Sequence, residues 1–179
     1  MTAMENTDRE QLLRLLKASR KKLVESVEDL TDEQAKARPA EDRWSILECV
    51  EHVGQVEDAI FAAVTTKLAP TDAPADRSRE TKIISGATDR NRKVPAPEHV
   101  KPAGKFASLA DALAYFEKSR ARSIEYVETC DKDLRTIAGA HPVLGQASGQ
   151  EFMIIMALHP ARHALQILEA RESLGLDSD

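Results

Sequence analysis

The stretch IIMALHPARHALQIL, residues 154–168, is the part of the chain that decides the fold. Residues 152–158 would be apolar around almost the whole circumference of a helix, which is typical of a helix buried on every side. We therefore predict a buried helix over 149–174, ended by Gly175 because glycine favours the helix C-terminus. The helix carries His159 and His163 on one face, because residues four apart are neighbours on a helix surface. Pro160 stands between them, where a helix interior normally rejects proline.

Three further helices are predicted from apolar residues at helical spacing, over 8–30, 46–68 and 109–130. Each of the four begins near a capping box, a Ser or Thr followed three residues later by an acid. The boxes are Thr7–Glu10, Ser45–Glu48, Ser108–Asp111 and Ser148–Glu151. The sequence has no strand alternation of useful length, so we expect an all-α single domain spanning residues 1–179.

A connection of nearly 40 residues, from about 69 to 107, joins the second and third predicted helices and holds five of the eight prolines. A loop this long in a compact domain is usually functional or disordered. It is long enough to return along the whole molecule, so these two helices can run parallel. The expected fold is a four-helix bundle with one long crossover between helices 2 and 3, in up-down-down-up order. The segment RETKII, residues 79–84, is expected to add a helical turn inside the crossover.

Composition excludes several classes of protein. The 179 residues are 42% hydrophobic and carry a net charge of -5, which suits one globular domain and repels nucleic acid and anionic membranes. No apolar run approaches the ~18–20 residues of a membrane span, and the first 20 residues resemble no signal peptide. Two cysteines, Cys49 and Cys130, make no disulfide framework, so we expect a soluble cytoplasmic protein.

Three of the five histidines can form a site. His52 lies near the apolar seam of the second helix, and it can meet His159 and His163 if the second and fourth helices are neighbours. Three neutral imidazoles leave coordination positions open on a metal ion, as in catalytic sites. The commoner role of a semi-buried histidine, a hydrogen-bonded core residue, stays open from spacing alone. His99 and His141 lie beside prolines and are expected to be loop residues.

Two familiar metal patterns are excluded. The segment HPARH, residues 159–163, has the histidine spacing of a zincin but has Pro160 where that motif needs its glutamate base. A di-iron bundle needs paired Glu-x-x-His motifs, and none of the three histidines is preceded by glutamate at the third position.

The order of motifs resembles the DinB-like superfamily of damage-inducible proteins. The resemblance rests on RWSILECVEHV at 43–53, KPAGKFASLADAL at 101–113, HPVLGQASGQEF at 141–152 and HPARHALQI at 159–167. It implies a four-helix bundle that is often a homodimer, with a divalent metal, nickel or zinc, held by His52, His159 and His163. Gln166 and Arg162 match positions that accompany this site. We interpret Gln166 as a hydrogen-bonding neighbour of the ligands and Arg162 as a surface or interface charge.

The resemblance implies two functions. One is a metal-dependent transferase or isomerase that acts on a low-molecular-weight thiol and an electrophile. The other is a non-catalytic metal- or ligand-binding protein of the stress response. Cys49, one turn before His52, could be taken for a nucleophile, and we interpret it as a small core residue.

Pro160 departs from the family pattern, in which a residue compatible with a helix usually stands at that position. Proline removes its own N–H and clashes with the carbonyl of Met156, four residues back. We expect the resulting kink either to re-aim His159 or to open the bundle beside the ion.

Overall fold

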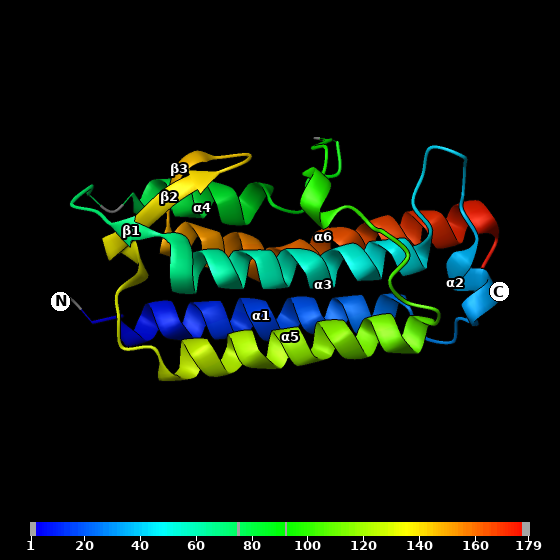
Figure 1. Ribbon diagram of the computed structural model, residues 1–179, viewed down its shortest axis with the longest axis horizontal. Helices are drawn as coiled ribbons and strands as arrows, with labels where there is room; N and C mark the ends of the chain where they lie inside the picture. The colour runs from blue at the N-terminus through cyan, green and yellow to red at the C-terminus, as the bar shows by residue number, and fades with distance from the viewer. Residues whose placement is uncertain (1–2, 75, 92, 177–179) are drawn as a thin grey trace.

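Four long helices lie side by side in the computed structural model, which describes residues 3–74, 76–91 and 93–176 (Figure 1). They are α1 (Asn6–Ser26), α3 (Ile46–Ala62), α5 (Leu109–Thr129) and α6 (Gly149–Leu174). Helix α1 packs against α5 and α6, and α3 packs against the same two helices. In Figure 1 the chain runs one way through α1 and α6 and the opposite way through α3 and α5. The four-helix bundle is confirmed, and α3 and α6 are neighbours.

Shorter elements lie at the ends and along one side of the bundle. Helix α2 (Asp32–Lys36) lies at the end where the C-terminus is drawn. The π-helical turn η1 (Ala63–Lys67) extends α3. The segment between α3 and α5 also contains the strand β1 (Ala69–Pro70), the helix α4 (Arg77–Gly86) and the 3-10 turn η2 (Glu98–Val100). The turn η3 (Leu134–Thr136) follows α5.

The expectation of an all-α fold is wrong in one respect. Strands β2 (Ile137–His141) and β3 (Gly145–Ser148) form an antiparallel hairpin, and β1 pairs with β2 on its other edge. The register places Ala69 opposite Ala138, and Gly139 opposite Ala147. Strands of two to five residues are too short to show a period of two in the sequence, and β1 joins the sheet from far away along the chain.

Capping explains where most of the helices begin. Ser45 and Ser148 each accept a hydrogen bond from the backbone three residues on, and Glu48 and Glu151 complete the two predicted boxes. The Ser108 side chain also caps its helix. The predicted box at Thr7 is wrong, because α1 begins two residues earlier, at Asn6, with Glu5 as a cap that makes no side-chain hydrogen bond. Gly175 ends α6 in the left-handed conformation, with φ of 65°, as predicted.

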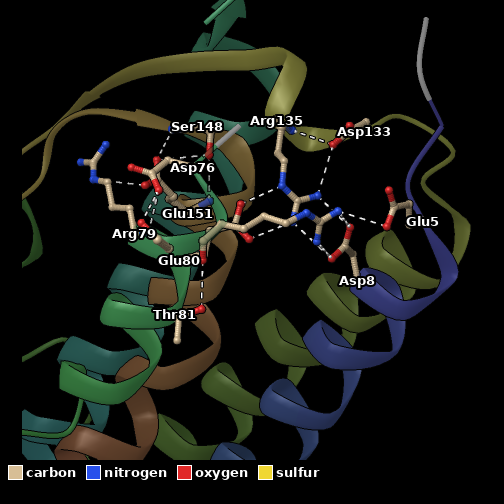
Figure 2. A network of polar contacts seen from close by, with 12 residues as sticks. Glu5, Asp8, Asp76, Arg79, Glu80, Thr81, Asp133, Arg135, Ser148 and Glu151 are labelled. Atoms are coloured by element: carbon tan, nitrogen blue, oxygen red, sulfur yellow. Dashed lines mark hydrogen bonds and ion pairs between the residues drawn. The ribbon is translucent and has the colours of Figure 1, made fainter. Parts of the chain in front are cut away.

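A network of buried charges holds the sheet end of the bundle together (Figure 2). Arg135 of η3 bonds Asp8 of α1 at 2.7 Å and Glu80 of α4 at 2.7 Å. Arg79 of α4 lies 3.2 Å from the carboxylate of Glu151, at the start of α6. Through these pairs, α4 is fixed across the ends of two long helices.

Candidate metal centre

The three predicted ligands lie together inside the bundle. Helix α3 contributes His52, and α6 contributes His159 and His163 from consecutive turns of one face. The Nε2 atoms of His159 and His163 are 3.1 Å apart. The ring centroid of His52 lies 5.0 Å from that of His159 and 4.8 Å from that of His163. One ring nitrogen from each of the three residues lies within 4.8 Å of the others.

The His52 ring is oriented by the segment that links α3 to α5. Its Nδ1 atom lies 2.6 Å from the carbonyl oxygen of Val100 in η2. A carbonyl can only accept, so Nδ1 carries the proton and donates, and Nε2 keeps its lone pair. Histidines that bind metals usually have their second ring nitrogen fixed in this way.

The neighbouring residue, Glu51, fixes the same segment. Its buried carboxylate accepts hydrogen bonds from the backbone N–H groups of Ala103 at 2.7 Å and Lys105 at 3.1 Å. The side chain of Gln55 donates a third at 2.8 Å. Two consecutive residues of α3 therefore bind the two ends of the 100–105 segment.

Helix α6 binds the same connection further upstream. Arg90 donates to both carboxylate oxygens of Glu169, at 3.1 and 2.9 Å, and to Oε1 of Gln166 at 3.1 Å. Arg162 donates to the backbone carbonyls of Ala87 and Asp89. The two residues that accompany the motif thus bind the connection beside the site.

Burial disfavours the charged form of all three imidazoles. Burial lowers the pKa of His52, although the hydrogen bond with Val100 acts in the opposite direction. Burial, and then the charges of neighbouring histidines and arginines, lowers the pKa of His159 and His163 well below 6.5. Neutral imidazole is the form that binds a metal.

The spacing of the two α6 histidines suits a divalent ion. Zinc binds histidine nitrogen at ~2.0–2.1 Å, so two histidines on one ion must place their nitrogens roughly 3 Å apart. The Nε2 atoms of His159 and His163 have this separation, and a ring nitrogen of His52 lies within 4.8 Å of each of the other two donors. Within residues 3–74, 76–91 and 93–176, no carboxylate or thiol joins this group of donor atoms.

Other candidates lie outside the site. Cys49 is fully buried in the apolar core, and burial raises the pKa of its thiol to about 12, so the interpretation as a core residue holds. His99 lies in η2, and His141 ends β2, where its Nδ1 accepts from the backbone of Val143 at 3.2 Å. Sequence reasoning assigned no role at the site to Glu51 or to Trp44, whose ring centroid is 4.8 Å from that of His52. Both lie within the motif RWSILECVEHV at 43–53, which was the signal that could have found them.

Comparison with known proteins identifies the superfamily. Residues 15–167 match the family model of the DinB superfamily. The uncharacterized protein YuaE of Bacillus subtilis strain 168 is 26% identical over 145 residues, which cover 81% of this chain and 88% of that protein.

Solved structures share the fold. The chain is similar to YfiT from Bacillus subtilis, described as a probable metal-dependent hydrolase with an unusual four-helix bundle topology. The TM-score is 0.61 at 16% identity, covering 98% of this chain and 92% of that one. A conserved protein of Enterococcus faecalis gives a TM-score of 0.66 at 15% identity, covering 98% and 100% of the two chains. Among the described residues, no helix combines the length and the apolar character that a membrane crossing needs.

Proposed function

Because the chain belongs to the DinB superfamily, we propose that it is a metal-dependent enzyme whose divalent ion, nickel or zinc, is held by His52, His159 and His163. The observation that carries the proposal is the meeting of three imidazoles from two helices inside the bundle. Imidazole suits nickel and zinc equally well, so the donors support either ion.

The reaction class that we propose is transfer of a low-molecular-weight thiol to an electrophile. A divalent ion held by three neutral histidines keeps open coordination positions and supplies Lewis acidity that makes a thiol or a water more acidic. In the transfer, the sulfur forms a bond to an electrophilic carbon, the leaving group departs with the bonding electron pair, and the thiol proton passes to solvent. A water in place of the thiol would give hydrolysis, the activity suggested for YfiT.

The chain's own residues orient the ligands and limit access. The hydrogen bond from His52 to Val100 leaves Nε2 free and fixes the ring plane. Glu51 and Arg90 hold the connection between α3 and α5 against the helices that carry the histidines. The substrate mouth would then be formed by this connection and by the half-buried ring of Trp44.

One observation favours a second function, that of a non-catalytic metal- or ligand-binding protein. His52 and His163 are only 4% and 6% exposed, and the connection between α3 and α5 is bonded to both helices beside them. An ion enclosed in this way would serve sensing, storage or stability of the bundle.

Elemental analysis of purified protein tests the site. We expect about one equivalent of a divalent metal in the wild type and in a His99→Ala control, and little in His163→Ala. Equal metal content in the wild type and His163→Ala would overturn the proposal. Metal-loaded protein is then assayed for thiol conjugation and for hydrolysis on a broad panel. Inactivity throughout would favour the second function, and light scattering tests the expected homodimer.

A further inference from the structure

Helix α6 continues through Pro160 and leaves one of its own carbonyls without a helical donor. Residue 160 would normally donate its backbone N–H to the carbonyl of Met156, four residues back. Proline has no N–H, so that bond cannot form. Met156 is completely buried, where an unpaired carbonyl is costly.

The missing donor is supplied from another helix. Arg120 of α5 is 0% exposed, and its Nη2 atom donates to the carbonyl oxygen of Met156 at 3.1 Å. The same atom donates to Glu57 of α3 at 2.8 Å. The other amino group, Nη1, donates to the carbonyl of Leu16 at 2.9 Å and to the hydroxyl of Ser19 at 3.1 Å, both on α1. One guanidinium group therefore bonds to all three of the other long helices.

We propose that Arg120 is a positioning residue for the metal site, which it serves by binding the backbone carbonyl that Pro160 leaves free. The turn from Met156 to Pro160 contains His159, and α6 cannot fix this turn with its own hydrogen bond. Arg120 fixes it against α1, α3 and α5. This inference rests on the proposed metal site, and it explains how the chain keeps a ligand next to a proline.

The residue type fits this role. A guanidinium presents five donors in a rigid planar fork, so it can reach acceptors on several sides at once, whereas a lysine ammonium is a single point. The buried carboxylate of Glu57 balances the charge of Arg120. A buried arginine without such a partner would be strongly destabilising. The guanidinium carbon also lies 5.3 Å from the centre of the Phe116 ring.

A double-mutant cycle on metal affinity tests the inference. One arm replaces the ion pair by Arg120→Met with Glu57→Gln, which avoids leaving a single buried charge. The other arm is Pro160→Ala, which restores the backbone donor to Met156. Zn²⁺ affinity is measured by competition with a chromophoric chelator for the wild type, for each arm and for their combination. Unfolding of the metal-free proteins is followed in parallel.

We expect loss of the ion pair to weaken Zn²⁺ binding about 10-fold or more when residue 160 is proline, as for other groups that orient ligands. With alanine at 160 the same change should cost much less, because the restored N–H pairs with Met156. An equal loss in both backgrounds would show that Arg120 acts only through general packing and would overturn the inference. So would the absence of any loss. If wild type and Pro160→Ala bind no metal, the proposed site itself fails instead.

Two further variants keep the test decisive. Arg120→Lys retains the charge beside Glu57 but cannot span the same acceptors, and it replaces the first arm if that protein does not fold. Arg135→Met removes a buried arginine from the sheet end of the bundle (Figure 2). We expect it to lower stability and to leave the Zn²⁺ affinity of the folded protein within about 2-fold of the wild type, since effects at distant independent sites are additive. If Arg135→Met loses Zn²⁺ affinity to the same extent, the loss seen in the Arg120 variants is explained by lost stability, and the inference is overturned.

Discussion

Replacing Glu51 by glutamine should loosen the connection between α3 and α5 at the point where it orients His52. The wild-type carboxylate accepts from Ala103 and Gln55 through Oε1 and from Lys105 through Oε2. A glutamine has the same shape but only one acceptor atom. Its best placement keeps the oxygen on the side of Ala103 and turns the amide NH₂ toward the N–H of Lys105, where two donors then face each other.

The size of the effect follows from these contacts. The hydrogen bond from the Lys105 N–H to the carboxylate is half-buried, and losing such a bond costs about 0.5–1.5 kcal/mol. The cost can be relieved by letting residues 100–105 open into water, so we expect local opening rather than unfolding of the bundle. At 1.4 kcal/mol per factor of ten, the opening equilibrium should rise by about 2- to 12-fold. Because Val100 holds the His52 ring, metal affinity should fall as well.

Amide hydrogen exchange read by mass spectrometry measures this opening directly. Peptides covering residues 98–106 should exchange faster in Glu51→Gln, while peptides from α5 keep their wild-type rates. Glu98→Gln is the matched control, since it makes the same chemical change on an 86% exposed side chain of the same connection. Wild-type exchange of residues 100–105 in Glu51→Gln would refute the reasoning, because it would mean that the carboxylate does not hold this segment.

Three further outcomes are expected. Burial by itself would raise the pKa of Asp8, but the hydrogen bonds and charges of Arg135 and a second arginine keep it below 3.8. The ionised Asp8 therefore stabilises the folded protein fully above pH 3.8, and this stabilisation is lost as the pH falls through the folded-state pKa. Acid unfolding of Asp8→Asn should show a weaker pH dependence in that range. Trp44 is the single tryptophan, with its ring centroid 6.4 Å from that of His163; Ni²⁺ should quench its fluorescence in the wild type, and quenching that persists in His163→Ala would contradict the site. Ser148→Ala removes a helix cap and should lower the free energy of unfolding in urea by about 0.5–2 kcal/mol, whereas an unchanged midpoint would show that the cap contributes nothing.

The sequence predicted what is local. The capping boxes at Ser45 and Ser148 involve residues three apart, so the starts of α3 and α6 could be located from the chain alone. The separation of four residues between His159 and His163 likewise placed both rings on one face. These local rules were sufficient for the bundle and for two of the three candidate ligands. The third, His52, needed α3 and α6 to be neighbours, which the resemblance to a family suggested and the packing shows.

The sequence could not predict what depends on distant contacts. Strand β1 is two residues long and acquires its partner only when β2 arrives from about 70 residues downstream. Arg120 occupies a position in α5 that a hydrophobic pattern would assign to the core, yet it is the largest fully buried side chain among the described residues. Its burial is possible only because acceptors from three other helices surround it, and no local pattern reveals such a set.

Pro160 shows how local sequence patterns and contacts between distant segments act together. Read locally, a proline between two histidines weakens the case for a ligand pair, because it breaks the hydrogen bond that would hold their turn. In the folded protein the two Nε2 atoms nevertheless lie 3.1 Å apart, and both face His52. The orientation of the rings depends on two carbonyls that the helices do not use themselves. The carbonyl of Val100 accepts from the His52 ring, and that of Met156 accepts from Arg120. Helical spacing therefore determines which side chains can lie together, whereas hydrogen bonds to free backbone carbonyls determine how those side chains are oriented.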